Sequence, residues 1–163
     1  MLKYVDTLVS FQEVPDEISL CINLSNCPNN CIGCHSPWLK QDTGTKLDVN
    51  SLFDLINNNR GITCICFMGG DSDPVELNEL AFAIKLRSDY PYKVAWYSGK
   101  DYILPGIDID NFDYIKIGPY IEEKGGLNNP DTNQKMFKIG KDGIINITNK
   151  FWKNDRTEKE STC

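Results

Sequence analysis

The chain has 163 residues, of which 40% are hydrophobic and 25% charged, and its 17 basic and 23 acidic residues give a net charge of −6. These values are typical of one soluble domain, and no apolar run is long enough to cross a membrane. Lys and Arg form no cluster, which argues against broad binding to nucleic acid or to an anionic membrane surface. Because the N-terminus also lacks the basic flank and apolar stretch of a signal peptide, we expect a cytoplasmic protein.

The first half of the chain predicts two strands and a helix around a cysteine-rich loop. Segments 3–13 and 18–24 are rich in β-branched and apolar residues and flank a Val-Pro-Asp-Glu turn, so we predict two strands with a tight connection. After the loop, leucine and isoleucine recur at helical spacing and predict a helix over 48–59. Asp48 and Asn50 are its candidate N-caps.

The second half alternates between strand and helix patterns. Residues 62–68 form a nearly unbroken apolar run, typical of a parallel strand that is buried on both faces. A second helix is predicted to begin near Pro74, and strands are predicted at 92–98 and 112–117. Residues 101–111 are too short and broken for a full helix. The alternation predicts βαβ units around a parallel sheet.

The end of the chain predicts a hairpin across residues 140–143 and a polar, flexible tail over 153–163. Without a repeat or a linker, we expect a single domain over residues 1–152. About six strands are too few for a closed eight-unit barrel. We therefore expect an α/β fold in the form of a small, open, partial TIM-like (β/α) barrel with extra N-terminal strands and a C-terminal hairpin.

Three of the seven cysteines, Cys27, Cys31 and Cys34, form a CxxxCxxC motif. Three thiolates so closely spaced can hold one iron–sulfur cluster and leave one iron without a protein ligand. A zinc site is the alternative, but structural zinc takes four ligands, and the lone histidine, His35, is adjacent to Cys34. Three more cysteines fall in predicted strands and are interpreted as buried hydrophobic residues: Cys21, Cys64 and Cys66.

A second candidate site follows the apolar strand. Gly69, Gly70 and Asp71 would lie at the C-terminal edge of the sheet, where such folds build their sites. Two glycines allow a ligand to approach the backbone, and the Asp71 carboxylate can accept hydrogen bonds from an ammonium group. The alternative is a plain strand-to-helix turn. For Asp73 we favour a helix-capping role.

The cysteine motif followed by a glycine-rich acidic turn resembles the radical S-adenosylmethionine (SAM) superfamily. The resemblance implies that the three cysteines hold a [4Fe–4S] cluster, whose unligated iron chelates the amino and carboxylate groups of SAM. It also implies that Gly69, Gly70 and Asp71 hold the SAM ammonium. Asp71 replaces the usual glutamate. Gly33 replaces a frequent aromatic residue, so an adenine contact there would come from its backbone.

A narrower resemblance, whose motifs span residues 27–139 and so most of the chain, is to the activating proteins of anaerobic ribonucleoside-triphosphate reductase. It rests on segments 31–38 and 67–71 and above all on the C-terminal motifs KIGPY at 116–120, GGL at 125–127 and TNQ at 132–134. It implies an iron–sulfur oxidoreductase that cleaves SAM to a 5′-deoxyadenosyl radical and installs a glycyl radical on the catalytic subunit of the reductase. An electron donor such as flavodoxin or ferredoxin would be its second partner.

Two other readings of the function stay open. One is a radical SAM enzyme that acts on a small molecule or on another glycyl-radical enzyme. The other is a zinc-binding interaction domain.

Three weaker candidates complete the predicted site. Ser98 ends a strand and is a candidate contact for the SAM carboxylate or ribose, although a serine–glycine turn explains it equally. Lys116 lies in an apolar strand, where its charge needs either a partner such as a ligand carboxylate or a path to solvent. The 118–134 loop either is a plain surface loop or docks the reductase and shapes the site.

Overall fold

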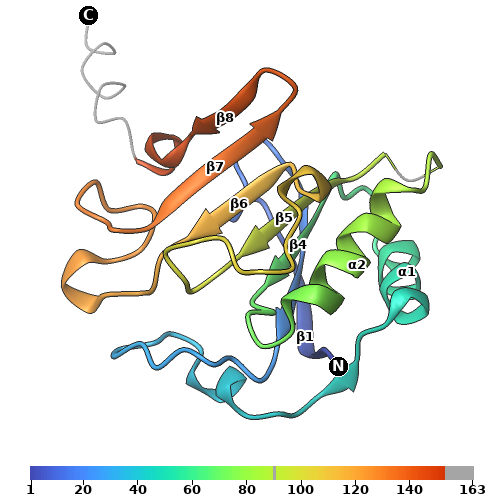
Figure 1. Cartoon of the computed structure of the whole chain (residues 1–163), viewed down its shortest axis with the longest axis horizontal. Coiled ribbons are helices and arrows are strands. Elements are labelled where there is room, and N and C mark those ends of the chain that lie inside the picture. The colour runs from blue at the N-terminus through green and yellow to red at the C-terminus, as the bar shows by residue number, and fades with distance from the viewer. Residues whose placement is uncertain (90, 153–163) are drawn as a thin grey trace, which may run out of the picture.

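A computed structural model describes residues 1–89 and 91–152 (Figure 1); the predicted tail at 153–163 lies outside them. The strands are β1 (Lys3–Ser10), β2 (Ser19–Leu24), β3 (Thr45–Lys46), β4 (Cys64–Met68), β5 (Lys93–Tyr97), β6 (Tyr114–Ile117), β7 (Lys135–Gly140) and β8 (Gly143–Asn146). The α-helices are α1 (Val49–Asn58) and α2 (Pro74–Lys85). None of the helices in these two ranges combines the length and apolar character needed to cross a membrane.

The strands form one mixed sheet of eight strands in the order β3-β1-β2-β4-β5-β6-β7-β8. The central strands β2, β4, β5 and β6 are parallel, and the flanking pairs are antiparallel. The predicted α/β class, parallel core, N-terminal strand pair and C-terminal hairpin are confirmed. A TIM-like barrel is not shown, because the two edges of the sheet do not join and two α-helices pack on it within the described ranges.

Both α-helices pack on one face of the sheet, which we call the helical face (Figure 1). Asp48 caps α1 through a capping box with Ser51, so one of the two candidate caps is confirmed, while Asn50 lies inside the helix. Asp73 caps α2 by accepting a hydrogen bond from the Glu76 backbone N–H, as predicted. Each cap satisfies N–H groups that have no partner within the helix.

The opposite side of the sheet, which we call the loop face, has its own smaller core. Cys21, Cys64 and Cys66 are buried there against side chains of the connecting loops, which confirms their interpretation as buried residues. Burial raises the pKa of the Cys64 and Cys66 thiols above the ordinary value. These two thiols therefore stay protonated near neutral pH and are poor metal ligands.

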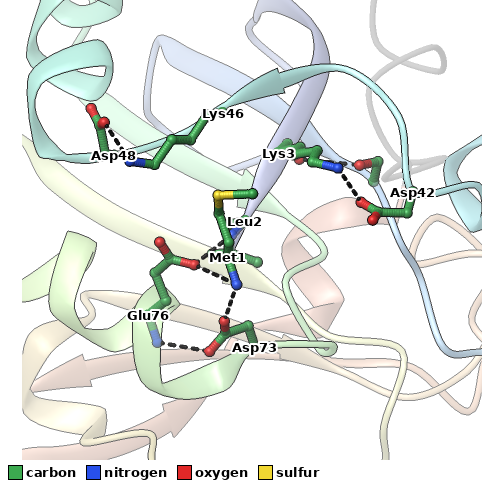
Figure 2. A network of polar contacts seen from close by, with 9 residues as sticks. Met1, Leu2, Lys3, Asp42, Lys46, Asp48, Asp73 and Glu76 are labelled. Atoms are coloured by element: carbon green, nitrogen blue, oxygen red, sulfur yellow. Dashed lines mark hydrogen bonds and ion pairs between the residues drawn. The ribbon is translucent and has the colours of Figure 1, made fainter.

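The first residues of the chain are held against the start of α2 (Figure 2). The Met1 ammonium lies 2.6 Å from Asp73 Oδ2 and 3.2 Å from Glu76 Oε2, and the Leu2 backbone N–H donates to Glu76. The ammonium of Lys3 lies 3.0 Å from Asp42 Oδ1. The contacts of Met1 and Leu2 join the segment before β1 to the first turn of α2, the helix that follows the Gly69–Asp71 turn.

Candidate functional site

The C-terminal ends of the parallel strands place one row of side chains on the loop face. Asn23, Met68, Tyr97 and Lys116 are consecutive register partners on β2, β4, β5 and β6. Because side chains alternate between the two faces, the buried cysteine pair Cys21 and Cys66 lies in the row two residues earlier on the same face. The row lines a pocket of about 200 Å³, which we call the edge pocket.

The cysteine motif lies on a closed loop at this pocket. The Asn26 backbone N–H donates to the Gln41 carbonyl at 3.1 Å, and the Cys27 N–H donates to the Leu39 carbonyl at 2.9 Å, so the ends of the loop are tied together. Its three cysteines are all partly exposed and all line the edge pocket: Cys27, Cys31 and Cys34. The structure thus brings the three predicted ligands to the same pocket.

Two residues of the predicted glycine turn, Gly69 and Asp71, line the same pocket, whereas Gly70 is not part of its lining. Gly69 and Gly70 have φ angles of +108° and +94°, in the region that favours glycine. A Cβ on Gly70 would lie 3.0 Å from Leu77 Cδ2 and 3.1 Å from Leu24 Cδ1, so a side chain there would require both leucines to shift. The Trp96 indole N–H donates to the Gly69 carbonyl at 3.0 Å and fixes the turn to β5.

Asp71 has one carboxylate oxygen in use and one without a partner. Its Oδ2 atom accepts hydrogen bonds from Asn29 Nδ2 at 2.8 Å and from the Gly99 N–H at 2.9 Å. Its Oδ1 atom is buried and accepts no hydrogen bond from any residue in the described ranges, and the residue as a whole is 9% exposed. A buried acceptor without a donor is costly, so this atom points to a ligand with an N–H or O–H group.

Lys116 places a buried ammonium group in the same pocket. It is 7% exposed, and its Nζ atom donates to the Ser98 carbonyl at 3.2 Å and to the Gly118 carbonyl at 2.7 Å. Burial lowers the pKa of Lys116 to about 8, although the charges of Asp71 and Cys31 act in the opposite direction. The side chain therefore ends inside the protein and does not reach out to solvent.

The remaining candidates are placed differently. Ser98 lines the pocket, but its hydroxyl accepts a hydrogen bond from the Lys100 N–H at 3.0 Å. This hydrogen bond is typical of the serine–glycine turn, the alternative explanation for Ser98. Gly33 lies outside the residues that line the pocket, and a Cβ added to it would meet Glu122 at 3.0 Å. From the 118–134 loop, Tyr120 and Gln134 line the pocket.

Sequence reasoning did not assign several residues that line the pocket, among them Asn29, Met68 and Tyr97, and it included Tyr120 and Gln134 only as part of the 118–134 loop. The period-two alternation of β5 was the available signal for Tyr97, since it places Tyr97 on the same face as Ala95. The ring of Tyr120 packs against His35 with centroids 4.6 Å apart and joins the 118–134 loop to the cysteine loop. No local pattern predicts such a contact.

Comparison of the chain with protein-family models, with curated proteins and with solved structures found no match.

Proposed function

We propose that this protein is a radical SAM enzyme that installs a glycyl radical on the catalytic subunit of an anaerobic ribonucleoside-triphosphate reductase. The observation that carries the proposal is that three partly exposed thiols and a buried carboxylate oxygen without a partner line one pocket. The resemblance of the cysteine, GGD and C-terminal motifs to the reductase activators supports the choice of substrate. In the same proposal, the open sheet corresponds to a partial TIM-like barrel.

The donor groups fit the two cofactors. Soft thiolates are the ligands that iron–sulfur clusters require, and Cys27, Cys31 and Cys34 would supply three of them. Within residues 1–89 and 91–152, no three His, Cys, Asp or Glu side chains converge on a place for a single metal ion. A zinc ion would be bound by all of its ligands at about 2 Å, whereas each thiolate of a cubane cluster would bind a different iron.

The chain's own residues would bind and orient SAM. Asp71 Oδ1 is free to accept a hydrogen bond from the SAM ammonium, and Asn29 and the Gly99 N–H hold the carboxylate in place through its other oxygen. Lys116 would attract the SAM carboxylate. When bound, the reduced cluster would supply one electron to the SAM sulfonium, and cleavage of a carbon–sulfur bond would give methionine and a 5′-deoxyadenosyl radical; taking a hydrogen atom from a glycine Cα of the reductase would then leave 5′-deoxyadenosine and the glycyl radical.

The test of this function uses the cluster-reconstituted protein, a reductant, SAM and the anaerobic reductase under anaerobic conditions. We expect 5′-deoxyadenosine in solution and a glycyl radical signal on the reductase in electron paramagnetic resonance (EPR). Formation of 5′-deoxyadenosine without a glycyl radical would favour a different radical SAM substrate. A protein that binds one zinc tightly and never cleaves SAM would instead be a zinc-binding interaction domain.

A further inference from the structure

Gln134 lies where the edge pocket meets a larger cavity on the loop face. This cavity, which we call the cleft, has a volume of about 760 Å³. It is bounded by residues 11–15 after β1, by His35, by β5, by the loop before β7 and by the 3-10 helix Thr148–Phe151. The edge pocket and the cleft share Tyr97 and Gln134. A ligand in the cleft would therefore reach the edge pocket past these two side chains.

The side-chain amide of Gln134 has no partner. The residue is 8% exposed, and its backbone N–H donates to Thr132 Oγ1 at 3.1 Å. In the described parts of the chain, its side-chain oxygen and nitrogen make no hydrogen bond. Neither atom is among the fully buried side-chain atoms without a partner, so both stay open to the cavities that Gln134 lines. An open amide at the junction of two cavities is placed to hydrogen-bond a ligand that supplies both an acceptor and a donor.

The backbone around Gln134 is tightly held. A Cβ on Gly118 would lie 3.0 Å from the Cα atom of Gln134, so the two chain segments are in close contact. Gln134 precedes the buried Met136 by two residues and therefore shares its face of the sheet, the loop face. The amide is thus presented from a fixed position.

The cleft suits an uncharged chain better than an ion. Its basic residue Lys150 lies 2.6 Å from the Asp16 carboxylate, and the Tyr97 hydroxyl donates to the Glu13 carbonyl. The rest of the lining includes amide and aromatic side chains, among them Phe11, which is 71% exposed. Amide and aromatic groups are typical of surfaces that bind polypeptide segments.

We infer that Gln134 is a positioning residue that hydrogen-bonds the peptide group of the reacting glycine, while the rest of the substrate segment lies in the cleft. A primary amide offers one acceptor and one donor, and a peptide group offers the complementary N–H and C=O. Glycine has no side chain to keep its peptide group away from the wall. The inference rests on the proposed function for the identity of the reacting residue.

Binding of short blocked peptides tests this role. The probes are a fluorescein-labelled library with a central glycine and randomised flanks, and the same library with sarcosine, which lacks the N–H, at the centre. Fluorescence anisotropy is measured on the full chain, with and without reconstitution of the cluster, and without reductant. We expect the wild-type protein to bind the glycine library about tenfold more tightly than the sarcosine library, because the lost N–H leaves the Gln134 oxygen unpaired.

Two variants separate a positioning role from a structural one. Gln134→Leu should bind both libraries equally and about tenfold more weakly than the wild type binds glycine peptides. The control Gln41→Leu makes the same change at an exposed residue outside both the cleft and the edge pocket, and it should keep the wild-type affinity and the preference for glycine. Urea unfolding of both variants checks their fold.

Equal binding of the two libraries by the wild type would overturn the inference, as would a preference that survives Gln134→Leu. Because no step uses SAM cleavage, the peptide result stands even if the proposed function fails. Conversely, glycyl radical formation without the peptide preference would overturn the role of Gln134 alone.

Discussion

A single substitution at Asp71 tests the proposed role of its carboxylate oxygen Oδ1 in SAM binding. In Asp71→Asn the amide oxygen can still accept from Asn29 and Gly99, which turns the amide N–H₂ group toward the place of the SAM ammonium. We expect the Kd for SAM to rise about tenfold or more, since a charge-assisted hydrogen bond is lost and two donors then face each other. Isothermal titration calorimetry of the reconstituted protein measures the change. Asp142→Asn, in the exposed β7–β8 turn, is the control and should leave the Kd unchanged.

Lys116 predicts a pH dependence of SAM binding. Its pKa of about 8 means that the ammonium is charged below that pH and is lost as the pH rises through it. Since the SAM carboxylate binds the charged form, the contribution of Lys116 to the Kd should be constant on the acidic side of pH 8 and should raise the Kd by up to tenfold per pH unit above it.

The matched control is Lys116→Met, which keeps the length of the side chain but removes the charge. Its Kd should be higher at neutral pH and should change with pH only through the titration of SAM itself. A wild-type profile parallel to that of Lys116→Met would rule out the carboxylate contact.

At the scale of elements, the caps of the two helices have different consequences. Asp48→Ala removes the capping box of α1, a helix that does not adjoin the Gly69–Asp71 turn in the sequence. We expect this variant to lose about 1 kcal/mol of unfolding free energy without a change in the Kd for SAM. Asp73→Ala removes the cap of α2 and also one of the two carboxylate partners of the Met1 ammonium. Because Asp73 follows Asp71 by two residues and its side chain fixes the first turn of α2, we expect loss of this cap to loosen the Gly69–Asp71 turn and to weaken SAM binding as well.

Urea unfolding and calorimetry on the same samples measure both quantities. If Asp73→Ala lost stability but bound SAM like the wild type, the α2 cap would not position the turn.

Local patterns predicted most elements because each pattern has a local cause. The spacing of hydrophobic residues and the capping residues predicted α1 and α2, and the apolar runs predicted β4 and β5. The rule that sites form at the C-terminal edge of parallel strands predicted that the cysteines and Asp71 would lie close together, and all of them line the edge pocket. The hydrogen bond from Asn29 to Asp71 joins residues 42 positions apart, and no local pattern encodes it. Gly33 was assigned to the cofactor site from the resemblance alone, yet it lies against Glu122.

At the scale of the whole molecule, burial distinguishes two sets of thiols on the same side of the sheet. The three cysteines of the edge pocket are partly exposed, whereas Cys21, Cys64 and Cys66 are buried beneath the loop face. Iodoacetamide should therefore alkylate the first set in the native protein without a cluster, and the second set only after unfolding. Peptide mass mapping reads out each position. Fast native labelling of Cys64 or Cys66 would contradict the described core.

The central claim is that Cys27, Cys31 and Cys34 hold a [4Fe–4S] cluster that leaves one iron open to SAM. The most direct measurement is EPR of the reduced protein after anaerobic reconstitution with iron and sulfide, recorded with and without SAM. We predict a [4Fe–4S] signal that changes on addition of SAM, that is lost in Cys27→Ala, Cys31→Ala and Cys34→Ala, and that is retained in the buried control Cys64→Ala. A colourless protein, or a cluster signal that survives alanine at all three positions together, would contradict the account.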